Sequence, residues 1–251
     1  MTSNIISRCA MTAMALVISA PLAAQDGPST FSLPVGCEAY VTIQNADCSV
    51  DHHFVCEGDQ EGYKNRVSLS QMGMTYMGTV DDETQWITSF HVLSDRSEAL
   101  DPNPTDPASI TELMEIGIDT YDFTTTSPQN GTTRFVGQDS LTGRQITIDG
   151  VTLDETQYNI TAYDGAGDVM WQSEGHEFIN RNWRFFLSGT GKITTPTDTF
   201  DTDGTPVEFI YPGEAGFLSA NPKHGCGIEM SGFDAPQSPL LLRLSALVEN
   251  N

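Results

Sequence analysis

Lysine is scarce in this sequence. Only Lys64, Lys192 and Lys223 occur, and Lys and Arg together number 11 against 34 Asp and Glu, for a net charge of −23. Binding to nucleic acid requires clustered Lys and Arg near phosphates, and electrostatic attraction to anionic lipid headgroups requires the same. The composition therefore argues against nucleic acid and anionic membrane surfaces as partners. Strong acidity is typical of a soluble chain, with specific cation binding as the alternative.

The motifs of the common enzyme classes are also missing. The sequence has no G-x-S-x-G nucleophile elbow, no H-E-x-x-H zinc motif and no C-x-x-C pair. The stretch SGTGK ends like a phosphate-binding loop, but Ile193 stands where Ser or Thr is required. Among 34 acids, some pair will lie at the spacing that glycosidases use, so a secreted hydrolase with a carboxylate pair stays an alternative.

No apolar run reaches the roughly 20 residues that a membrane-spanning helix needs. Residues 1–24 instead have the order of a secretory signal peptide: Arg8, an apolar run over residues 10–18, and small residues up to Ala24. We therefore expect a soluble periplasmic or secreted protein, with residues 25–251 forming a single β-rich domain. Removing Arg8 would leave 10 basic residues against 34 acidic ones.

Four cysteines remain after the predicted signal peptide, which contains Cys9. They are Cys37, Cys48, Cys56 and Cys226. An even number of cysteines in an exported chain indicates disulfides, and four cysteines allow three pairings. We expect Cys48 to pair with Cys56 in a short loop, and Cys37 to pair with Cys226, which would join the start of the fold to its end.

Apolar residues recur mainly with a period of two, as in β-strands. In CEAYVTIQ, residues 37, 39, 41 and 43 are predicted to face one way and residues 38, 40, 42 and 44 the other. RQITIDGVTL reads as two strands around an Asp149-Gly150 turn, and Asn130-Gly131 and Asp164-Gly165 mark further turns. QYNITAY, DVMWQSEG, HEFI, WRFFLSG and VEFIYPG are predicted to be successive strands.

Two segments favour helices. TDPASITELMEIGID offers Asp106 as N-cap, an apolar stripe of Ile110, Leu113 and Met114, and Gly117 as the end. Residues 238–250 favour a second helix, or an edge strand, at the end of the chain. The predicted fold is mainly β: a curved antiparallel sheet or partly open barrel of about ten strands, with one or two short helices packed on it.

Aromatic residues concentrate in the last third of the chain and indicate a candidate ligand site. In WRFFL, Trp183, Phe185 and Leu187 share one face of the predicted strand, while Phe186 is on the other. A strand that is apolar on both faces is either buried in a core or lines a cavity. The cavity interpretation gives a small apolar or amphiphilic ligand, with candidate binding residues Trp171, Trp183, Phe185, Tyr211 and Glu214.

Calcium is the metal for which the sequence offers the best candidate loop. DTFDTDGTPVE contains Asp198, Asp201, Asp203 and Glu208, a set of oxygen ligands of the kind that calcium prefers. The spacing is not that of an EF-hand, and a D-x-D-G stretch is also a common solvated turn. No other cofactor is indicated.

Adjacent histidines His52 and His53 lie in CSVDHHFVC. On a strand, neighbouring side chains point to opposite faces, so the pair cannot bind one metal together. We expect the imidazoles to be partly exposed. One of them could meet a distant partner such as His91 or His224.

The segments CEAYVTIQNADC, DDETQW, ITIDGVTL and PVEFIYPGEAGF resemble those of exported alphaproteobacterial proteins of unknown activity. That resemblance implies an exported β-rich protein and no particular reaction. The expected architecture is also similar to the lipid-carrying half-barrels of the periplasm, an analogy at the level of fold alone. The sequence as a whole predicts an exported binding protein for an apolar or amphiphilic ligand. The alternatives are an envelope-interaction protein stabilised by divalent cations, and the hydrolase.

Overall fold

The computed structural model describes residues 30–227. The signal peptide predicted for residues 1–24 and the helix predicted for residues 238–250 lie outside the described residues. Among residues 30–227, no helix is long and apolar enough to cross a membrane.

The described chain consists almost entirely of antiparallel strands. Its first strands are β1 (Cys37–Asn45), β2 (Val50–Cys56), β3 (Lys64–Ser70), β4 (Gly73–Val80), β5 (Trp86–His91) and β6 (Arg96–Leu100). The short 3₁₀-helix η1 (Val92–Ser94) joins β5 to β6, and α1 (Ile110–Ile116) precedes β7. The remaining strands are β7 (Ile118–Ser127), β8 (Gly131–Ile148), β9 (Val151–Tyr163), β10 (Val169–Asn180), β11 (Phe185–Leu187), β12 (Thr190–Thr194), β13 (Thr199–Asp203) and β14 (Pro206–Ile210).

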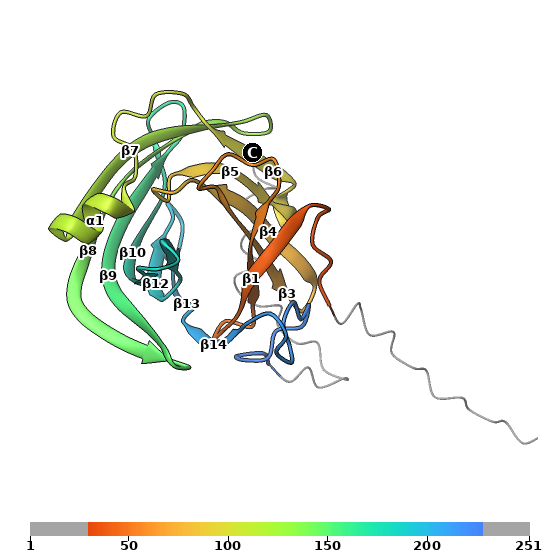
Figure 1. The fold of residues 1–251 in the computed structure, drawn as a ribbon. Helices are drawn as coiled ribbons and strands as arrows, with labels where there is room; N and C mark the ends of the chain where they lie inside the picture. Colours follow the sequence, from red (N-terminus) through yellow and green to blue (C-terminus); the bar gives the residue numbers. More distant parts are fainter. Residues whose placement is uncertain (1–29, 228–251) are drawn as a thin grey trace, which may run out of the picture.

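These fourteen strands form one sheet that curves strongly (Figure 1). Strands β1 to β10 follow one another as a meander; β12 and β13 extend it beyond β10, and β14 returns to pair with β1. The curvature brings β1, β3 and β4 opposite β8, β9 and β10 (Figure 1). The prediction of a curved, mainly β sheet is confirmed. The strand number is larger than the expected ten, and the sheet does not close, because β13 and β14 form its two edges.

Local turn chemistry explains the hairpin at the end of the longest strand. Asp149 and Gly150 join β8 to β9 with φ angles of 47° and 78°, both in the left-handed region that a tight type I′ turn requires. The predicted turn is therefore confirmed. The strands themselves are longer than expected, since β10 runs without interruption through DVMWQSEG and HEFI, which we had expected to form two strands.

The helix predicted near residue 110 is present, but its N-cap was wrongly predicted. Ser109 caps α1, because its hydroxyl accepts a hydrogen bond from the backbone N–H of Glu112. Asp106 lies before the helix and pairs through its backbone with Asp122 on β7. Gly117 ends the helix as expected.

Strand β1 is buried on both faces over residues 41–45. A register shift between Ala39 and Val41 places Ala39 in an outer cluster with β2 and β3, whereas Val41 and Ile43 face the interior of the curve. The single alternating face predicted for residues 37–43 was therefore wrong at this bulge. On the outer side, the segment after β14 covers the strand, because the Gln44 side chain hydrogen-bonds to the backbone of residues 221 and 223.

Two disulfides form among the four cysteines, as expected, but the expected pairing was wrong. Cys37 and Cys56 are direct cross-strand partners on β1 and β2, with their Cα atoms 3.9 Å apart. Cys48 lies in the turn at the other end of this hairpin, so the length of β2 separates it from Cys56. Cys48 bonds instead to Cys226 and attaches the last described segment to the sheet.

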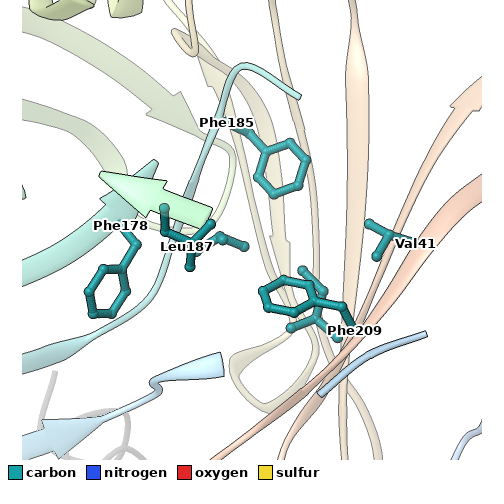
Figure 2. Packing of buried hydrophobic residues seen from close by; sticks show 7 residues of the cluster. Val41, Phe178, Phe185, Leu187 and Phe209 are labelled. Atoms are coloured by element: carbon teal, nitrogen blue, oxygen red, sulfur yellow. The ribbon is translucent and has the colours of Figure 1, made fainter. Parts of the chain in front are cut away.

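The main hydrophobic cluster joins the two sides of the curved sheet. Figure 2 shows Phe178, Phe185 and Leu187, from β10 and β11, in one cluster with Val41 of β1 and Phe209 of β14. These strands are far apart in the hydrogen-bonding order of the sheet. The contacts therefore pack the interior near the sheet edges and leave the interior between the other strands for a pocket.

Candidate functional site

A pocket of about 490 Å³ occupies the interior of the curved sheet. This volume falls within the range of about 300–1,000 Å³ that is usual for small-molecule sites. The wall formed by β3 to β6 is mostly polar, whereas β7 to β10 contribute most of the aromatic residues. The residues that line the pocket include His53, Lys64, Arg66, Tyr76, Gly78, Trp86, His91, Arg96, Glu98, Tyr121, Phe123, Phe135, Asp139, Tyr158, Trp171, Ser173, Glu177 and Phe185.

The aromatic wall follows one row of cross-strand neighbours. Strand pairing places Phe123 of β7 beside Phe135 of β8, and both Phe135 and Trp171 of β10 pair with Ala162 of β9. Trp86 from β5 packs edge-on against Phe123 and Phe135, at ring-centroid distances of 5.5 and 5.1 Å. Such edge-to-face contacts stabilise aromatic clusters beyond the area that they bury.

One end of the pocket is closed by stacked rings. His53 of β2 stacks on Phe185 of β11 with ring centroids 4.2 Å apart, which joins opposite sides of the sheet. Burial lowers the pKa of His53 to about 3, so this imidazole is neutral at ordinary pH. Its neighbour His52 points to the outer face, where it stacks on Phe31. The prediction that the two histidines face opposite ways is confirmed, and the expected exposure was wrong, since both are buried.

A hydrogen-bonded group of charged residues lies on the polar wall. Arg96 and Glu98 of β6 form an ion pair of 2.8 Å, and the Glu98 carboxylate also accepts a hydrogen bond of 2.7 Å from Thr125. His91 lies 3.8 Å from the same carboxylate. Burial, and then the positive charge of Arg96, lower the pKa of His91. The charge of Arg96 is therefore already balanced within the protein.

Arg66 of β3 is held against an aromatic face inside the pocket. Its guanidinium carbon lies 4.9 Å from the ring centroid of Tyr76, a cation–π contact. Gly78 provides the space for that ring, because a Cβ atom there would come 2.1 Å from the Tyr76 hydroxyl. Within residues 30–227, Arg66 makes no ion pair with a carboxylate.

Two carboxyl groups line the same pocket in a form that resists ionisation. Burial raises the pKa of Asp139 on β8 to about 8, with the charges of Glu177 and Asp119 adding to the effect. Burial likewise raises the pKa of Glu177 on β10 to about 7, although Arg66 lowers it in part. Both groups can therefore donate a hydrogen bond near neutral pH. Beside them the hydroxyls of Tyr158 and Ser173 are hydrogen-bonded at 2.9 Å.

The predicted ligand-binding residues fall in two places. Trp171 and Phe185 line the pocket. Trp183 stacks behind Phe185 and packs with Phe209 and Tyr211 in the hydrophobic cluster at the sheet edges. Glu214 lies in the following turn, where its carboxylate accepts a hydrogen bond from the backbone N–H of Tyr211. Trp183, Tyr211 and Glu214 thus support the pocket's closed end rather than line it.

The acidic residues considered for calcium do not converge. Asp201 and Asp203 lie on β13, and Asp203 accepts a hydrogen bond from the backbone N–H of Thr205. Glu208 on β14 forms an ion pair of 3.0 Å with Lys223, and Asp198 lies in the turn before β13. Across the described part of the chain, no three His, Cys, Asp or Glu side chains are grouped to hold a metal ion.

The chain matches no known family model, no curated protein and no solved structure. Function must therefore be argued from the pocket. Aromatic rings on β7 to β10, with Asp139 and Glu177 on the same strands and Arg66 on the facing wall, suit a molecule with both apolar and polar parts. Sequence reasoning missed Arg66, Asp139 and Glu177. A weak signal existed for Arg66, which is one of only 11 basic residues and sits in the alternating strand KNRVSLS.

Proposed function

We propose that this chain is an exported binding protein that holds a small amphiphilic molecule in the pocket of its curved sheet. The observation that supports the proposal best is the composition of the pocket: a row of aromatic rings together with a few polar groups, Arg66 on one wall and Asp139 and Glu177 on the other. Two disulfides suit an oxidising compartment such as the periplasm or the cell exterior.

Ligand capture tests this proposal directly. The disulfide-bonded chain, purified under mild conditions, is expected to carry a small molecule that native mass spectrometry detects. After removal of that molecule it should bind a fluorescent fatty-acid analogue. Trp171→Ala removes part of the aromatic wall and should weaken binding about tenfold. Val169→Ala, at an exposed position on the same strand, is the matched control. Absence of both a bound molecule and probe binding would refute the proposal.

A hydrolase using a carboxylate pair is the second candidate, because Asp139 and Glu177 line one pocket and the charge of Glu177 adds to the raised pKa of Asp139. A group with a pKa near 7 is suited to general acid–base chemistry. Turnover of ester or glycoside substrates that disappears in Glu177→Gln, with ligand binding retained, would favour this candidate. Binding without turnover across such a panel favours the carrier.

A further inference from the structure

Positive charge is concentrated in the pocket of an otherwise acidic protein. Three of the 11 basic residues of the chain, Lys64, Arg66 and Arg96, line this one site. Lys64 is paired with Asp82 at 3.1 Å, and Arg96 is paired with Glu98 at 2.8 Å. Arg66 is the pocket cation that lacks such a partner within residues 30–227.

The acidic groups near Arg66 in the described part of the chain attract it without lying within ion-pair distance. Burial raises the pKa of Asp139 to about 8 and that of Glu177 to about 7, so at neutral pH Asp139 is mostly protonated and Glu177 is only partly ionised. Asp51 also attracts Arg66, but its two carboxylate oxygens already accept hydrogen bonds from Ser68 and Asn45. The attraction of Asp51, Tyr76 and Glu177 outweighs the burial of Arg66 and raises its pKa, so the guanidinium stays charged. An incoming carboxylate would give this charged guanidinium the direct charge-assisted hydrogen bonds to a carboxylate that it lacks among residues 30–227.

We propose that the pocket recognises the carboxylate of an amphiphilic monocarboxylic acid, with Arg66 as its anchor and the aromatic wall as the site of its apolar tail. This inference rests on the proposed binding function and names the chemical class of the ligand. A singly charged carboxylate matches the single unpaired cation, whereas a phosphate monoester would bring close to two negative charges. The planar guanidinium is also suited to bidentate contact with a carboxylate.

The pocket also separates the two ends of such a molecule. On β10, Trp171 and Glu177 are six residues apart, which is about 20 Å along an extended strand. On β8, Phe135 and Asp139 are four residues apart, which is about 13 Å. On these two strands the aromatic row and the two carboxyl groups thus lie at different positions along the strands, so a head near Arg66 and Glu177 leaves length for a tail toward Trp171.

Calorimetric titration with matched ligands tests the proposal. The probes are a fatty acid, and the alcohol, amine and phosphate monoester of the same chain length, each added to the disulfide-bonded chain at neutral pH. The acid is expected to bind about tenfold to a hundredfold more tightly than the alcohol, the advantage of a charge-assisted hydrogen bond. The amine should bind most weakly. An alcohol that binds as tightly as the acid, or a phosphate monoester that binds more tightly, would overturn the proposal.

Variants of the anchor make the test specific. Arg66→Met should remove the preference for acid over alcohol while leaving alcohol binding in place, and Arg66→Lys should retain part of the preference. Arg144→Met, at an exposed site on β8, is the matched control and should behave like the parent chain. If Arg66→Met does not fold, the order of affinities of the four probes for the parent chain still tests the proposal. Loss of preference without loss of alcohol binding separates this inference from the proposed function, which falls only if no amphiphile binds.

Discussion

Replacing Glu177 by glutamine should stabilise the protein at alkaline pH and leave it unchanged in acid. The side chain lies in the pocket on β10, and burial raises its pKa from 4.5 to about 7 even with Arg66 nearby. Above pH 7 the folded protein must therefore hold an ionised carboxylate in an enclosed site, whereas the unfolded chain exposes that carboxylate to water. Glutamine has nearly the same shape and cannot ionise.

The sign and size of the effect follow from proton linkage. Because the folded pKa lies above the unfolded one, the contribution of Glu177 is fully present below pH 4.5 and is lost as the pH rises through about 7. The difference between a pKa of 4.5 in the unfolded chain and about 7 in the folded protein corresponds to roughly 3 kcal/mol of folding free energy, at about 1.4 kcal/mol per pKa unit. Water in the pocket would reduce this free energy. Asp139 acts in the same direction. His52 and His53, with lowered pKa values, act in the opposite direction below pH 6.5.

Comparison of the variant with the parent chain cancels the contributions of His52 and His53. Glutamine also removes the charge that helps to raise the pKa of Asp139, which adds to the advantage of the variant in alkali. Urea denaturation at pH 4.5 and at pH 8.5 should give equal stability for both proteins in acid, and an advantage of up to about 3 kcal/mol for Glu177→Gln in alkali. Glu174→Gln, at an exposed position on the same strand, is the control and should change little at either pH. An equal difference at both pH values would refute the reasoning, because Glu177 would then ionise alike in the folded and unfolded states.

Three further substitutions test other parts of the structure. Replacing Cys48 and Cys226 together by serine opens a loop of 178 residues and should cost up to about 5 kcal/mol in the chain-entropy treatment, measured by urea denaturation; no loss would mean that the bond constrains little. Phe185→Ala removes a ring from the main cluster and should cost about 3–5 kcal/mol in the same assay, with a smaller loss if the site collapses. Gly78→Ala should displace the ring of Tyr76 and weaken carboxylate binding several-fold by calorimetry, whereas unchanged affinity would show that the ring can move without consequence.

Local patterns in the sequence predicted the mainly β character and individual turns, but not the number or the lengths of the strands. The Asp149-Gly150 hairpin and the end of α1 at Gly117 depend on a few neighbouring residues, so they could be read directly. The strand predicted for WRFFLSG was only partly right, because it extends over Phe185–Leu187 alone and Trp183 and Arg184 lie in the preceding turn, where Arg184 has a φ of 51°. Phe185 packs in the cluster at the sheet edges, and Phe186 packs on the other side with the residues of α1.

Errors arose where distant parts of the chain decide the outcome. The disulfide pairing depends on the register of β1 and β2, which places Cys37 opposite Cys56 and leaves Cys48 at the far end of the hairpin. The burial of Gln44 depends on a segment that follows β14. Neither the disulfide pairing nor the burial of Gln44 can be predicted from the spacing of the residues concerned.

The candidate site was only half predicted for the same reason. Aromatic content drew attention to Trp171 and Phe185, both of which line the pocket. Arg66 and Glu177 are isolated charged residues on polar stretches, more than a hundred positions apart, so each looks like ordinary surface in the sequence. Only the curvature of the sheet brings β3 and β10 face to face.

The pairing of β14 with β1 also has a consequence for the order in which the molecule can assemble. The meander from β1 to β10 joins strands that are neighbours along the chain, so each can pair as soon as the next one is available. The free edge of β1 can form its hydrogen bonds only once β14 is available, and Cys48 can form its disulfide only once Cys226 is available. Until the last described residues arrive, one edge of the sheet stays open and the hydrophobic cluster lacks Phe209. Completion of this fold is therefore a late event, and a chain shortened before β14 would expose the unpaired edge of β1 to other molecules.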